Sequence, residues 1–98
     1  MVRAKFKVRS IARDTQSVPD GVDENGRQKW KNGEVRTIIL HPVYGGGDPN
    51  HENTKFWHAS PSGEIKLGCA NLAAAEAFEL DQEFYVDFTP VDQPSVRE

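Results

Sequence analysis

The chain opens with a regular alternation of apolar and charged residues. Apolar side chains take every second position from Val2 to Val8, and each is followed by a cation, which gives the basic row of Arg3, Lys5, Lys7 and Arg9. Successive side chains of a β-strand point to opposite faces, so a period of two predicts a half-buried strand over residues 2–11 with one basic face.

Residues 12–33 lack this alternation and carry turn signals at Pro19-Asp20-Gly21, Asn25-Gly26 and Asn32-Gly33. We therefore expect a long polar loop over residues 12–33. Part of it should pair, because long structureless loops are uncommon in compact domains. Asn-Gly favours a tight hairpin, which predicts residues 28–31 against residues 34–37 around Asn32-Gly33.

A second strand is predicted over residues 34–44, with one face formed by Val35, Thr37, Ile39, His41 and Val43. Pro42 cannot donate a ladder hydrogen bond, which places that end of the strand at an edge or a bend. Two further strands, over residues 54–59 and 64–69, flank the turn Ser60-Pro61-Ser62-Gly63. Proline and glycine at these positions favour a bulged hairpin.

The last third of the chain predicts a short helix and a final strand. Asn71 is a suitable N-cap for an alanine-rich helix over residues 72–80, whose apolar side holds Ala73, Ala74, Ala77 and Phe78. In the strand over residues 83–89, alternate positions predict that Phe84, Val86 and Phe88 point inward. We expect residues 92–98 to form a polar C-terminal tail.

These elements predict a mainly β domain over residues 1–91. Five strands, with a tight third-to-fourth hairpin and a short helix before the last strand, are typical of a small SH3-like barrel. The alternative is an OB-like barrel, although that fold places its helix between strands three and four. Closure of the sheet would remove exposed strand edges.

Composition narrows the class of protein. Ninety-eight residues allow one domain with a modest core, and the single cysteine, Cys69, excludes an intrachain disulfide and fits a reducing cytoplasm. Residues 1–7 lack the apolar run of a signal peptide, and we expect no membrane-spanning segment. Net charge is −3, divided between +4 in residues 1–36 and −7 in residues 37–98. This asymmetry favours partner steering or head-to-tail self-association, unless the halves neutralise each other within the fold.

Several segments resemble a family of small uncharacterised proteins of tailed bacteriophages and prophages. They are Lys5-Phe6-Lys7-Val8, His41-Pro42-Val43-Tyr44, Phe56-Trp57, Ser60-Pro61-Ser62-Gly63, Asn71-Leu72-Ala73-Ala74 and Phe84-Tyr85-Val86-Asp87-Phe88-Thr89. The chain departs from the family at Leu80-Asp81-Gln82, where Pro-Gly or Gly-Lys is usual, and in its longer connection 12–33. The resemblance implies a phage context, in the host cell cytoplasm or in the virion, and no established activity.

The candidate binding residues are basic or aromatic. Arg3, Lys5, Lys7 and Arg9 could grip phosphates, with Trp30, Tyr44, Trp57 and Tyr85 as stacking platforms for a single strand. The alternatives are an edge strand guarded by lysines and aromatic covers of the core. Trp57 and Tyr44, if exposed, are also candidate anchors for a protein partner.

Catalytic and metal-binding patterns are missing from the sequence. Asp48, His51, Glu52 and His58 have no recognisable ligand spacing, and Gly45-Gly46-Gly47 is not followed by the lysine and hydroxyl residue of a phosphate-binding loop. Cys69 alternates with Ile65 and Leu67, which predicts a buried thiol. We therefore expect no enzyme, no metal and no cofactor.

Our functional hypothesis is a non-enzymatic phage-type binding module that acts through a host or phage protein, inhibiting or redirecting a host factor in takeover or anti-defence. One alternative is a small barrel that binds single-stranded nucleic acid or a nucleotide. Another is a structural or accessory protein of the virion, with self-association.

Overall fold

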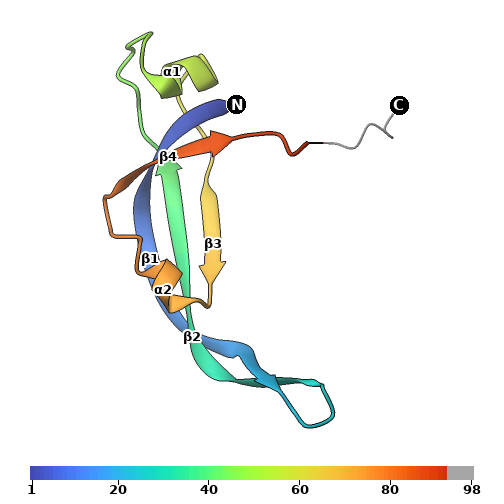
Figure 1. Ribbon diagram of the computed structural model, residues 1–98. Helices are drawn as coiled ribbons and strands as arrows, with labels where there is room; N and C mark the ends of the chain where they lie inside the picture. Colours follow the sequence, from blue (N-terminus) through green and yellow to red (C-terminus); the bar gives the residue numbers. More distant parts are fainter. Residues whose placement is uncertain (93–98) are drawn as a thin grey trace.

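The computed structural model describes residues 1–92 and consists mainly of β-strands. The elements are β1 (Val2–Val22), β2 (Gln28–Pro42), α1 (Glu52–Trp57), β3 (Ile65–Cys69), α2 (Leu72–Ala75) and β4 (Glu83–Phe88). The strands form one antiparallel sheet in the order β3-β2-β1-β4 (Figure 1). The mainly β prediction is confirmed. Where we expected a barrel of about five strands, SH3-like or OB-like, the structure has an open sheet of four, with β3 and β4 at its edges.

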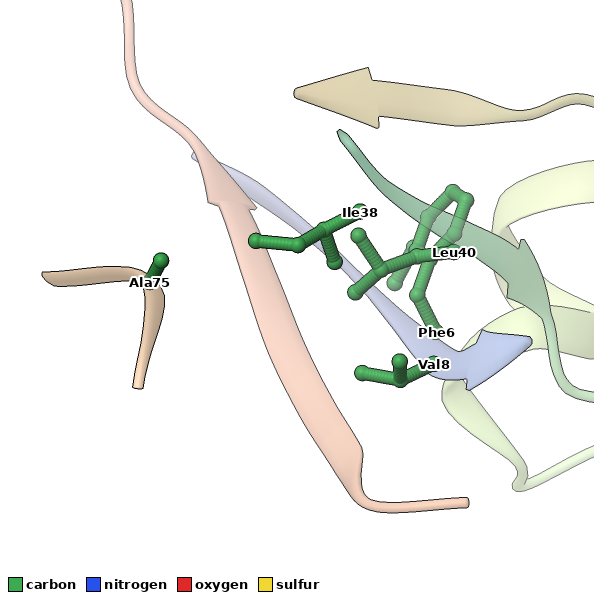
Figure 2. Packing of buried hydrophobic residues seen from close by; sticks show 6 residues of the cluster. Phe6, Val8, Ile38, Leu40 and Ala75 are labelled. Carbon is green, nitrogen blue, oxygen red and sulfur yellow. The ribbon is translucent and has the colours of Figure 1, made fainter. Parts of the chain in front are cut away.

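The core lies on one face of the sheet, here called the inner face. Phe6 and Val8 of β1 lie beside Ile38 and Leu40 of β2 (Figure 2), and all four side chains are buried together with Ala4 and Ala75. Phe84 and Val86 of β4 pack against this cluster, as predicted, whereas Phe88 is largely exposed. The alternation in β1 therefore predicted its buried face correctly as far as Val8.

Apart from Val35, which is buried, the face of β2 that the sequence pattern singled out is the outer one. Ile38 and Leu40 are buried, so Thr37, Ile39 and His41 point to the opposite side. Both faces of this segment are apolar enough to be buried, and the register with β1 decides between them. That register pairs Val8 with Leu40 and, after a bulge at Arg9, Ile11 with Ile38.

Residues 12–33 are not a loop, and this prediction was wrong. They belong to β1 and β2, which pair in antiparallel register from Phe6–Pro42 as far as Val22–Gln28. The chain reverses at residues 23–27, where Asp23 Oδ1 accepts hydrogen bonds from the backbone N–H groups of Asn25 and Arg27. Asn25-Gly26 is therefore the turn, with Gly26 at φ 80°. The tight hairpin predicted at Asn32-Gly33 is not formed, because Gly33 lies inside β2 opposite Gln16.

Beyond the sheet, β1 and β2 continue as a two-stranded arm, defined as residues 13–35. β3 pairs with β2 only up to Arg36, and β4 pairs with β1 only up to Lys7, so neither strand supports the arm. In Figure 1 the arm projects away from the rest of the sheet. The Cα radius of gyration is 18.4 Å, compared with about 13 Å for a compact domain of this length.

The segment predicted as a strand over residues 54–59 is the helix α1, which is a second correction. The ring Nδ1 of His51 caps its N-terminus by accepting from the Asn53 N–H, and His58 ends it in the left-handed region at φ 59°. Ser60–Gly63 therefore connects a helix to β3 instead of joining two strands as a hairpin.

The last elements agree more closely with the sequence pattern. β3 and β4 lie where strands were expected, and Asn71 caps α2 as predicted. α2 ends at Ala75 instead of Leu80, and Ala75 itself is the buried alanine. Cys69 is half-buried and packs against the core cluster. Of the predicted tail 92–98, all but Asp92 lies outside the described residues.

Candidate functional site

Half of the predicted basic row is paired with carboxylates of the same chain. Arg3 forms a two-pronged contact with Asp87 on β4, with Nε–Oδ1 and Nη2–Oδ2 distances of 2.6 and 3.0 Å. Its guanidinium also lies 4.6 Å from the centroid of the Tyr85 ring. The hydrogen bond from Arg3 holds the pKa of the Asp87 carboxyl below its usual value. Arg3 is thus engaged on the outer face by its cross-strand neighbours.

Lys5 lies between two glutamates. Its Nζ is 3.2 Å from Glu52 Oε1 and 3.8 Å from Glu83 Oε1, and the hydrogen bond to Glu52 raises the pKa of the lysine. Lys7 and Arg9 have no carboxylate partner within residues 1–92. The row therefore offers two free cations to a phosphate chain instead of four.

The four candidate aromatic residues do not form one platform. Trp57 is half-buried, its ring centroid lies 6.0 Å from that of Phe6, and its Nε1–H donates to the Ser62 carbonyl at 2.9 Å. Trp57 is therefore a cover of the core. Trp30, Tyr44 and Tyr85 are 59%, 69% and 56% exposed, and they lie on the arm, on the loop after β2 and on β4.

Asn53 on α1 is a structural residue that the sequence reading missed. Its Oδ1 accepts from the Lys5 N–H at 2.6 Å, and its Nδ2 donates to the carbonyls of Lys5 and Val43 at 2.7 and 2.6 Å. The side chain is fully buried. Asn53 bridges the Lys5 N–H and the Val43 C=O just beyond Pro42, where β2 ends, while the Val43 N–H donates directly to the Lys5 carbonyl. No apolar pattern in the sequence marks this position.

The base of the arm carries a second cluster that the sequence reading missed. Arg13 and Arg36 face each other across the β1–β2 pair, and Glu34 lies between them. Glu34 Oε2 is 2.8 Å from Arg13 Nε and 2.9 Å from Arg36 Nε. The hydrogen bonds from Arg13 and then Arg36 lower the pKa of Glu34 to about 2. The cluster offsets the repulsion between two opposed arginines.

An apolar groove lies between the two edge strands on the inner face. Its volume is about 410 Å³, and its apolar lining consists of Leu40, Ile65, Leu67, Phe78, Phe84 and Val86. Phe78 and Phe84 are in contact, with ring centroids 5.0 Å apart, and Leu67 is 40% exposed. Tyr85 and Asp87 complete the β4 side.

His51 and Asp48 have structural roles. His51 caps α1, and Asp48 Oδ1 accepts the Asn50 N–H at 2.9 Å. No group of three or more His, Cys, Asp or Glu side chains in residues 1–92 could hold a metal ion. Within the same residues, no helix has the length and apolar character needed to cross a bilayer.

Comparison with protein-family models, with curated protein sequences and with solved structures gives no match. The likeness to small phage proteins therefore stays a prediction. Three features of the structure bear on function. They are the projecting arm, the apolar groove between the unpaired edges of the sheet, and the basic row, half of which is neutralised by carboxylates.

Proposed function

We propose that the protein is a non-enzymatic binding module that acts through a protein partner and contacts it with the arm. The observation that carries this proposal is the arm itself. A two-stranded hairpin without a third strand or a packed face is marginally stable in water. The arm nevertheless extends β1 and β2 well beyond the sheet and presents Trp30 and Val22 to solvent.

The chemistry of the arm suits a protein surface. Aromatic residues supply a large share of the binding energy at protein interfaces. Trp30 stands opposite Pro19 on the arm, flanked in sequence by Lys29 and Lys31. A partner that covers this stretch would bury an apolar ring and pair the surrounding charges. Inhibition or redirection of a host factor by this contact is the specific form of the proposal that the phage resemblance favours.

Nucleic-acid binding is the weaker proposal. Arg3 and Lys5 are already paired with Asp87, Glu52 and Glu83, and the exposed aromatic residues lie apart. Proteins that bind single-stranded nucleic acid use a continuous positive groove with aromatic rings beside it for stacking. The described part of this chain does not offer that combination.

A site-specific photocrosslinker tests the proposal. It replaces Trp30 on the arm in one variant and the exposed Lys55 on α1 in a control variant, and both are irradiated in the producing cells. We expect a crosslinked adduct of defined mass from position 30 only. Identical adduct patterns from positions 30 and 55, or no adduct from position 30, would contradict an arm that contacts a partner.

A further inference from the structure

The groove between β3 and β4 has the features of a site for an added strand. Lys5 directs its N–H and C=O toward Asn53 and Val43, on the β2 side of β1. Because these groups alternate in direction along a strand, the neighbouring Ala4 and Phe6 direct theirs toward β4. Their partners Val86 and Phe84 therefore face β1. The peptide groups of Tyr85 and Asp87 point the other way, to the free edge that lines the groove.

The groove thus combines unpaired backbone groups at its edge with apolar side chains on its floor. An extended segment that pairs with such an edge gains main-chain hydrogen bonds, and alternate side chains of that segment enter the apolar floor. The arm is itself such a segment: among residues 1–92 no strand pairs with the outer edge of β2 beyond Arg36, and Trp30 on β2 is exposed.

The charges of the two surfaces are complementary. Residues 67–96 contain no lysine or arginine, and Phe78 of the groove lies in sequence between Glu76 and Glu79, with Asp81 next. None of these three carboxylates has an ion-pair partner in the described part of the chain. The arm carries three cations around Trp30, at position 27 in its turn and at positions 29 and 31 of β2. Lys31 reaches Asp20 at 3.6 Å, which is an exposed contact and worth little by itself.

We propose that the groove receives the arm of a second copy of this chain, with Trp30 on the apolar floor and the Arg27–Lys31 stretch beside β4. The arm projects away from its own sheet, so it cannot fill its own groove (Figure 1). The contact joins two different surfaces and is therefore heterologous, which generates a ring, a reciprocal pair or an open chain of copies. The added strand would lie in the gap between β3 and β4, where one more strand would bring the open sheet closer to a barrel. This inference rests on the arm as the contact surface of the proposed function, and it takes a second copy of the chain, instead of a host factor, as the partner of the arm.

Complementation between two variants tests the contact. Trp30→Ala removes the anchor of the arm, and Leu67→Glu places a charge in the groove at a side chain that is already 40% exposed. Tyr44→Ala, at an exposed aromatic residue away from both surfaces, is the matched control. Molar masses are measured by light scattering after size exclusion over a concentration series, and circular dichroism checks that each variant is folded.

We expect the wild type and Tyr44→Ala to associate with rising concentration, and each of the other two variants to be monomeric. An equimolar mixture of the two monomeric variants should form a dimer and nothing larger, because only the intact arm of Leu67→Glu and the intact groove of Trp30→Ala can join. Association should weaken at high ionic strength, since exposed charges are screened.

A wild type that stays monomeric up to its solubility limit overturns the inference, and so does association that survives both substitutions. Failure of the mixture to form a dimer also overturns it, because an arm that fits the groove must join the two variants. If the wild type is monomeric while position 30 still crosslinks to a different protein in cells, the binding-module proposal stands and only the self-association falls.

Discussion

Asn53 shows how one side chain can bridge two strands where their direct pairing is incomplete. Just beyond Pro42 the Val43 N–H still donates to the Lys5 carbonyl, and the amide of Asn53 links the Lys5 N–H to the Val43 carbonyl. A carboxylate could accept but not donate here, and an alanine could do neither. The requirement is specific to one residue type at a position that carries no apolar pattern, so hydrophobic periodicity could not predict it.

We expect Asn53→Ala to lower the free energy of unfolding by about 2–4 kcal/mol, because it leaves buried backbone groups without partners. Chemical denaturation monitored by tryptophan fluorescence measures the change. Asn50→Ala, in the exposed loop before α1, is the control and should change stability little. A loss at position 53 no larger than at position 50 would mean that water replaces the amide.

The Glu34 cluster predicts a dependence of stability on acid. The pKa of Glu34 in the folded chain is about 2, below its ordinary value near 4.5, so protonation favours the unfolded chain. Its contribution is therefore complete above pH 4.5 and is lost as the pH falls toward 2. We expect the difference in unfolding free energy between wild type and Glu34→Gln to narrow over this interval. A difference between the two proteins that stays constant from pH 4.5 to 2 would contradict this role of the cluster.

At the scale of elements, the predictions for residues 12–33 and 54–59 were wrong for different reasons. Residues 54–59 carry Thr, Phe and Trp, which favour strands, yet the cap at His51 and the hydrogen bonds of Asn53 fix a helix. Most side chains of the arm are exposed, so no apolar face marks its strands; the exception is Val35 at its base, which is buried. Patterns over the core-forming parts of β1, β3 and β4 succeeded because burial on one face imposes them.

Gly33 in the arm lies close to a valine of the facing strand, so it has little room for a side chain. A Cβ at this position would lie 2.6 Å from Val18 Cγ2 on the facing strand. We expect Gly33→Ala to destabilise the arm, by about 1 kcal/mol or more, because the stiff valine must shift. Hydrogen exchange of the arm amides should accelerate, while exchange at Ile38 and Leu40 stays unchanged. Pairing the substitution with Val18→Ala should restore slow exchange, and failure of that rescue would locate the effect elsewhere.

At the scale of the whole molecule, the buried cluster and the arm are built from different residues. The buried cluster draws on β1 up to Val8, on β2 from Ile38 and on α2, and it contains no arm residue. The groove follows from the same arrangement, because four strands with unpaired edges leave one apolar stretch of the inner face open. The sequence predicted the strands that border this groove but not the open sheet, since closure depends on the approach of two edges far apart in the chain.

Excision of the arm tests this separation. Replacing residues 14–35 by Asn-Gly joins the cross-strand pair Arg13 and Arg36 through a tight hairpin turn. We expect a folded protein with one cooperative unfolding transition. Small-angle scattering should give a radius of gyration several ångström below that of the wild type, which tends toward the value for compact domains. An unfolded product would show that the arm contributes to the core through contacts beyond the sheet.

Because the buried cluster contains no arm residue, the arm and the sheet are free to evolve at different rates. Substitutions, insertions and changes of length between residues 14 and 35 leave the buried cluster intact, so selection acts on them through what the arm touches and hardly through folding. The sheet, by contrast, is held by a few side chains that admit little change. Over generations, the molecule can acquire a new partner without first having to find a new fold.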